Sequence, residues 1–153
     1  MRLLVDTSYL LPAIGISVKG IPSDGMVKLI EEGHEIYASD ISIFELSAKG
    51  AKHVAAGTLS AERVARGIRA IVHDGTVTMI PIHESTLLLT AFKLRNVLSD
   101  LIDCLIIASA IYHSDMLITE DNDILDLKND IEFILLAKRI NPKFKIQKMT
   151  EKI

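Results

Sequence analysis

Four acidic residues of this chain stand where predicted strands end or where the following helices begin: Asp6, Glu45, Asp103 and Asp121. In a parallel sheet the carboxyl ends of the strands meet at one edge, so these side chains are expected to lie close together. Converging carboxylates repel one another unless some bind protons or a cation lies among them. Oxygen ligands without clustered Cys or His favour Mg²⁺ or Mn²⁺, ions that activate water and stabilise the charge on a phosphate during hydrolysis. The pattern therefore predicts a metal site suited to phosphate-ester hydrolysis.

Each acid also has a structural interpretation that needs no metal. Asp6 is suited to cap a helix that follows it. Asp100 is suited to cap the apolar helix expected over 101–111, with Asp103 at the third position of that helix. Residues 121–123 have the composition of a turn, and Glu45 is a typical solvated helix residue. None of these interpretations explains why acids follow three separate strands at the same edge. Asp100 therefore stays open as a cap or as an accessory ligand.

The stretch that must position these acids runs from 99 to 123 and contains a helix that is apolar on nearly every side. Residues Leu101 to Ile111 leave no broad polar face, so this helix is expected to be buried rather than amphipathic. A carboxylate on a buried helix is costly unless something compensates its charge. Asp103 is therefore the acid that most needs a partner.

Apolar runs and turn residues divide the rest of the chain into alternating strands and helices. Strands are expected over 2–5, 35–39, 76–80 and 116–119, with a short edge strand over 144–146. Helices are expected over 6–14, 24–32, 42–56, 60–73, 83–96, 101–111 and 123–128. This alternation predicts an α/β fold with a mainly parallel sheet of four to five strands, covered by helices on both faces.

The composition indicates one folded domain over 1–153, because 49% of the residues are hydrophobic and 24% are charged. Within it we expect a helical pair over 41–75 and a basic C-terminal segment over 139–153. The one cysteine, Cys104, lies in the apolar helix, which fits a reduced, cytoplasmic protein without an internal disulfide. Neither a signal peptide nor a membrane span is expected, since no apolar run is long enough.

Four segments resemble the acidic motifs of PIN-domain ribonucleases, the fold of VapC-type toxins. They are LLVDTSYLL, SDISIFELS, DLIDCLIIASA and MLITEDNDI, and the resemblance covers residues 2–124. It implies a three-layer α/β/α sandwich, bound Mg²⁺ or Mn²⁺, and cleavage of single-stranded RNA. Carried over position by position, it assigns catalysis and metal binding to Asp6, Glu45, Asp103 and Asp121, with Asp123, Ser8 and Thr119 as accessory residues.

The resemblance also implies partners. It suggests a homodimer and, if the chain is a toxin, an antitoxin protein. The family often has Arg or Lys beside the fourth acid, where this chain has Glu120 and Asn122. A more acidic rim is expected to weaken the approach of RNA or to shift the choice of substrate.

Other functions stay open from the residues alone. A housekeeping RNA-processing nuclease of the same family has the same motifs, and a PIN-like module kept only for protein contact is argued against by the complete set of acids. A response-regulator receiver domain or a phosphatase domain, in which an aspartate accepts phosphate, needs a paired acid after the first strand or a DxD motif. Asp6-Thr7-Ser8 supplies neither.

Basic residues over 46–73 are candidates for holding RNA beside the acids. They are Lys49, Lys52, Arg63, Arg66 and Arg69, with only Glu62 of opposite charge among them. The three arginines are spaced by three and form a slowly turning stripe on one helix, which suits phosphate contact but is equally typical of a solvated face. Aromatic residues are only 5% of the chain, so extensive stacking on bases is not expected.

Overall fold

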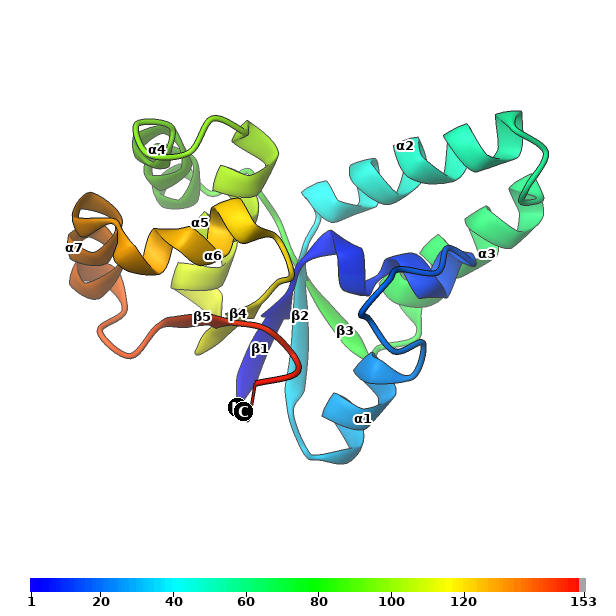
Figure 1. Ribbon diagram of the computed structural model, residues 1–153, viewed down its shortest axis with the longest axis horizontal. Coiled ribbons are helices and arrows are strands. Elements are labelled where there is room, and N and C mark those ends of the chain that lie inside the picture. The colour runs from blue at the N-terminus through cyan, green and yellow to red at the C-terminus, as the bar shows by residue number, and fades with distance from the viewer. Residues whose placement is uncertain (152–153) are drawn as a thin grey trace.

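The computed structural model describes residues 1–151 and contains a five-stranded, fully parallel sheet (Figure 1). Its strands are β1 (Arg2–Val5), β2 (Glu35–Ser39), β3 (Val77–Ile80), β4 (Met116–Ile118) and β5 (Lys145–Gln147), in the order β3-β2-β1-β4-β5. All neighbouring pairs are parallel, with Leu3 of β1 opposite Ile36 on one side and Met116 on the other. The predicted parallel sheet is therefore confirmed, and the carboxyl ends of all strands share one edge.

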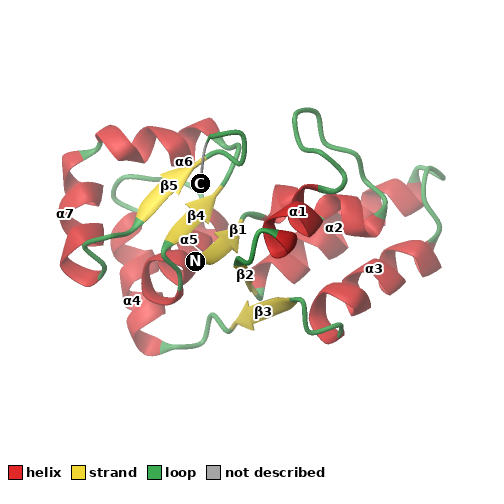
Figure 2. Ribbon diagram, turned by 90° about the horizontal axis from the view of Figure 1, so that it is seen from below, coloured by secondary structure: helices red, strands yellow, loops and turns green. Residues whose placement is uncertain are grey.

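Helices cover both faces of this sheet, as Figure 2 shows. One face carries α1 (Gly25–Glu31), α2 (Ile41–Ala55) and α3 (Ala61–His73), and the other carries α4 (Ser85–Leu94), α5 (Leu101–His113), α6 (Asn122–Asp126) and α7 (Ile131–Ile140). Successive strand residues point to opposite faces, so Leu3 and Val5 pack in one core and Leu4 in the other. The expected three-layer α/β/α sandwich is confirmed.

The α5 helix is the buried helix that the sequence predicts. Every residue from Cys104 to Ile111 is buried between the sheet and the helices beside it. Asp100 caps its N-terminus, since Asp100 Oδ1 accepts hydrogen bonds from the backbone N–H groups of Ile102 at 2.7 Å and Asp103 at 3.4 Å. The cap places Asp103 in the first turn, where α5 leaves the core.

The segment after β1 differs from the single helix expected over 6–14. It forms two 3₁₀ helices, Thr7–Tyr9 and Leu11–Ile14. Pro12 fits the first turn of the second one, and Gly15, with φ of 94°, ends it. This tighter path keeps Thr7 directly against the acid that precedes it.

The second difference is α7, because the sequence interpretation assigned no element to 129–140. Asp130 caps this helix by accepting a hydrogen bond from the Phe133 N–H at 2.8 Å, and Phe133 and Ala137 pack into the core. The predicted helix over 123–128 is in fact α6 followed by a 3₁₀ turn, Leu127–Asn129. The predicted basic segment 139–153 supplies β5, and its residues 152–153 lie outside the described residues.

Close packing between α3 and the second 3₁₀ helix fixes the region that follows β1. Gly67 lies so near the backbone of Ala13 that a Cβ at this position would collide with the Ala13 carbonyl oxygen. Gly50 on α2 is similarly close to the Val64 side chain of α3. These two contacts hold α2 and α3 beside the carboxyl end of β1. Within residues 1–151, no helix has the length and apolar character that crossing a membrane requires.

Candidate active site

The four predicted acids line one cavity of about 170 Å³ at the carboxyl edge of the sheet. Asp6 follows β1, Glu45 lies on α2, Asp103 on α5, and Asp121 directly precedes α6. These elements come together near the centre of Figure 1, where the end of β1 meets the start of α2. The cavity is also lined by Thr7, Ser8, Lys49 and Glu120.

Asp6 is the most buried of these acids, with 8% of its surface exposed. Its Oδ1 accepts a hydrogen bond from the Thr7 N–H at 2.6 Å, and its Oδ2 accepts one from the Thr119 hydroxyl at 2.7 Å. Burial raises the pKa of Asp6, the two hydrogen bonds oppose that rise, and the nearby Glu45 and Asp121 add to it. Thr119, predicted as an accessory residue, therefore orients the first acid.

Glu45 is fixed by a residue that sequence reasoning missed. The Thr7 hydroxyl lies 2.5 Å from Glu45 Oε2 and 2.9 Å from the Ser42 hydroxyl. Because the carboxylate only accepts, Thr7 donates its single proton to Glu45. The signal in the sequence was a polar residue directly after Asp6, and the structure buries it to 2% exposure.

Asp103 lies half-buried at the cavity, and its surroundings disfavour its ionised form. Burial is the first cause, and the charges of Asp100, Asp6, Asp121 and Glu45 follow, so that its pKa rises to about 7. No hydrogen bond to the Asp103 carboxylate is present among the described residues. Its charge is thus destabilised by the acids around it unless a proton or a cation is bound.

Asp121 has a structural role as well as a place in the cavity. Its Oδ1 accepts hydrogen bonds from the N–H groups of Asp123 at 2.8 Å and Ile124 at 3.3 Å, which caps α6. The other carboxylate oxygen takes no part in the cap. Asp123 is exposed and does not line the cavity. Asp100 does not line it either, and its carboxylate caps α5.

By chemistry the lining suits a hard dication, although its acids are not gathered around a single point. Among residues 1–151, no three His, Cys, Asp or Glu side chains lie close enough together to hold a metal ion. Mutual repulsion separates carboxylates, and hydrogen bonds already hold both oxygens of Asp6 and one of Asp121. The Ser8 hydroxyl, in contrast, is buried at the cavity without a hydrogen-bond partner in the described part of the chain. An orphaned hydroxyl beside carboxylates fits a hydrated Mg²⁺ or Mn²⁺.

The predicted basic residues fall into three groups. Lys49 lines the acid cavity and also a neighbouring groove of about 300 Å³, which it shares with Lys52. Arg63 is half-buried, and its guanidinium donates to the Ala13 carbonyl, so it serves the packing of α3. Arg66 and Arg69 are exposed.

The acidic rim beside Asp121 is partly neutralised from the C-terminal segment. Glu120 accepts a hydrogen bond from the Tyr9 hydroxyl at 2.6 Å, and its other oxygen lies 3.4 Å from Lys148 Nζ. The Met149 N–H donates to the same Tyr9 hydroxyl. Burial, followed by the bond to Glu120, raises the pKa of Tyr9. No sequence pattern indicates this ion pair, because its two residues lie in connecting segments far apart along the chain.

The structure is an α/β/α sandwich with acids at the carboxyl edge of a parallel sheet, the edge at which such folds bind their ligands. The family model for the PIN domain matches residues 3–130, and the chain belongs to this family, whose members are generally nucleases. No curated protein matches the chain at a significant level. The structure is similar to VapBC2 from Rickettsia felis, solved bound to a DNA fragment from its promoter. The TM-score is 0.59 at 17% identity, with 96% of this chain and 98% of that chain covered, which establishes a shared fold.

Proposed function

We propose that this chain is a divalent-metal-dependent endoribonuclease that hydrolyses phosphodiester bonds of single-stranded RNA. The observation that carries the proposal is the cavity to which four separate elements bring Asp6, Glu45, Asp103 and Asp121. Helix capping accounts for one oxygen of Asp121, but it gives no reason for the half-buried carboxylate of Asp103. Membership of the PIN family supports the same chemistry.

In this proposal the acids have distinct roles. Asp6, Asp103 and Asp121 hold Mg²⁺ or Mn²⁺ directly or through water, and Glu45 completes the shell or orients the attacking water. The bound ion supplies activation of that water and stabilisation of the charge on the phosphate. Thr7 holds Glu45 in place through its hydroxyl, and Thr119 does the same for Asp6. No side-chain nucleophile is required.

The basic groove beside the cavity is proposed to bind the RNA backbone. Lys49 borders both hollows, so a strand leaving the cavity meets Lys49 and then Lys52. Arg66 and Arg69 are exposed on α3 and are proposed to contact more of the RNA backbone, whereas Arg63 contributes less because it is already bound to a backbone carbonyl.

We further propose that the protein is a homodimer and the toxin of a toxin–antitoxin pair. The likeness to the Rickettsia felis VapBC2 structure supports an antitoxin partner. The test is coexpression with the product of a small reading frame directly upstream. Growth arrest that this product relieves supports the toxin role, and harmless expression favours a housekeeping RNA-processing enzyme instead.

The nuclease proposal is tested with the conservative variants Asp6→Asn and Asp103→Asn. Both should abolish Mn²⁺-dependent cleavage of a labelled single-stranded RNA while the circular dichroism spectrum stays that of the wild type. Asp126→Asn is the matched control, because Asp126 is exposed and lies outside the cavity, and it should cleave normally. Full cleavage by either site variant in a nuclease-free preparation would refute the assignment.

A further inference from the structure

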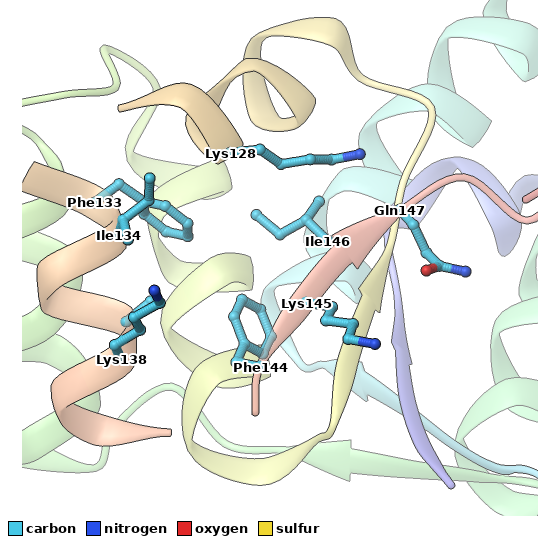
Figure 3. A pocket seen from close by; sticks show the side chains of 9 residues that line it. Lys128, Phe133, Ile134, Lys138, Phe144, Lys145, Ile146 and Gln147 are labelled. Atoms are coloured by element: carbon cyan, nitrogen blue, oxygen red, sulfur yellow. The ribbon is translucent and has the colours of Figure 1, made fainter. Parts of the chain in front are cut away.

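A second hollow lies between α7 and β5 and shares no residue with the acid cavity. This β5 groove has a volume of about 330 Å³ and an apolar floor of three buried side chains, Phe133, Ala137 and Ile146. In Figure 3, Phe133 and Ile134 of α7 face Ile146 of β5 and Phe144, which directly precedes β5, across it. The groove therefore has the size and lining to take an apolar side chain.

Lysines surround this apolar floor. Lys128 and Lys138 flank the groove, and Lys145 projects on the opposite side of β5 (Figure 3). All three are exposed, and none of the acidic residues within 1–151 lines the groove. Lys128 lies 4.0 Å from Glu151, an exposed pair of little strength. The groove is thus a positive region on a protein whose net charge is −3.

The backbone of β5 offers hydrogen bonds at the same place. In the sheet of the described residues β5 is the edge strand, paired only with β4. The Lys145 N–H donates to the backbone carbonyl oxygen of Asp115, and the Gln147 carbonyl oxygen accepts from the backbone N–H of Thr119. Since these groups point toward β4, the N–H and C=O of Ile146 between them point toward the free edge. An added strand can therefore bond to Ile146 beside the groove.

We propose that the β5 groove binds an extended acidic segment of a partner protein, which adds a strand to β5. Alternate side chains of that strand point to opposite faces. One set enters the apolar groove between Lys128 and Lys138, and the other lies beside Lys145 on the far face. The preferred segment therefore alternates apolar residues with Asp or Glu. This proposal is independent of the nuclease activity.

Two other occupants are disfavoured by the same features. Pairing of β5 with β5 of a second copy would bring lysines against lysines, and charged residues on an edge strand oppose such pairing. RNA would satisfy the lysines but leave the apolar floor and the free Ile146 backbone groups without suitable partners.

The experiment uses a random 12-residue peptide display library selected on the full-length protein. Selected peptides should alternate apolar and acidic residues, and their fluorescein-labelled forms should bind in a fluorescence anisotropy titration. The double variant Lys138→Glu/Lys145→Glu should weaken that binding by about tenfold or more. The control Arg139→Glu/Lys143→Glu makes the same charge change at exposed residues that do not line the groove, and it should bind normally.

Two further measurements test the added strand. Binding should slow hydrogen exchange of the Ile146 amide, and N-methylation of alternate peptide residues should abolish binding in only one of the two registers. Failure to select acidic peptides, or equal binding by the two double variants, overturns the proposal. Binding of a labelled single-stranded RNA that depends on Lys138 and Lys145 also overturns the proposal. The same holds if the protein is a dimer in solution and only the Lys138→Glu/Lys145→Glu variant is a monomer.

Discussion

At the scale of one residue, Asp103 shows how the neighbouring acids repel the charge of a carboxylate in the site. It is half-buried at the start of a buried helix, and the acids near it belong to β1, α2 and the turn after β4. Its pKa is raised to about 7 in the folded protein without metal. At a pH between 3.8 and about 7, the folded protein therefore keeps a proton on Asp103 that the unfolded chain has lost. The folded state therefore pays for ionising Asp103 as the pH rises.

This leads to a prediction about pH and stability. Between the pKa of the unfolded chain, 3.8, and the folded value of about 7, the native state binds more protons, so metal-free stability should fall as pH rises through that window. Asp103→Asn should remove the part of this fall that Asp103 contributes, while the part due to the raised pKa of Asp6 remains. The variant should therefore be more stable than the wild type at pH 8 but not at pH 4. Urea unfolding in EDTA at both pH values measures the difference.

Mg²⁺ provides the complementary measurement. It should raise the melting temperature of the wild type more at pH 8 than at pH 5, and it should have little effect on Asp103→Asn. Asp126→Asn serves again as the control. Identical pH profiles for wild type and Asp103→Asn would show that the charge of Asp103 is not destabilised in the folded protein.

At the scale of elements, the contact between α3 and the segment after β1 determines where Thr7 and the first acid lie. Gly67→Ala would drive a methyl group into the Ala13 carbonyl, and because that atom belongs to the backbone, α3 or the 3₁₀ helix must move. We expect a loss of about 1–3 kcal/mol in the free energy of unfolding, as for other overpacked cores. Cleavage of RNA should fall as well, since the displaced segment carries Thr7.

The matched control for this prediction is Gly25→Ala, at the start of α1. Its new Cβ meets the flexible side chain of Met149, which can move aside. Urea unfolding should therefore show little change, or a small gain from the better helix propensity of alanine. Equal costs at Gly67 and Gly25 would mean that the α3 contact is not tight.

The elements also show what sequence patterns can and cannot predict. Strands β1 and β2 were predicted with the bounds that the structure has, because each is an apolar run ended by polar residues. The α7 helix was missed although Asp130 caps it, because its short apolar run of β-branched, aromatic and leucine side chains fits a buried strand as well as a helix. Thr7 bound to Glu45, and Lys148 paired with Glu120, were beyond reach because both contacts depend on how separate elements pack.

At the scale of the whole molecule, charge is distributed unevenly around the acid cavity. The protein carries a net charge of −3, and Glu120 adds to the acids that phosphate must approach. Lys148, near the C-terminus, pairs with Glu120. Lys49, on α2, is the basic residue that lines the cavity itself. The C-terminal segment therefore compensates an acid that would otherwise repel the RNA backbone.

Removing that compensation should affect binding of RNA rather than the chemical step. Lys148→Met should raise KM about two- to fivefold with kcat unchanged, since this ion pair is only partly buried and pairs near the surface are worth about 1 kcal/mol or less. Adding Glu120→Gln should restore KM, because the double variant has lost the opposing charge too while Gln still accepts the hydrogen bond from Tyr9. Lys143→Met, also an exposed lysine, is the control and should leave KM unchanged. The effect should shrink as salt rises, because exposed charges are screened over about 10 Å at 0.1 M ionic strength. If the double variant keeps the high KM of Lys148→Met, then Lys148 binds RNA directly and does not act through Glu120.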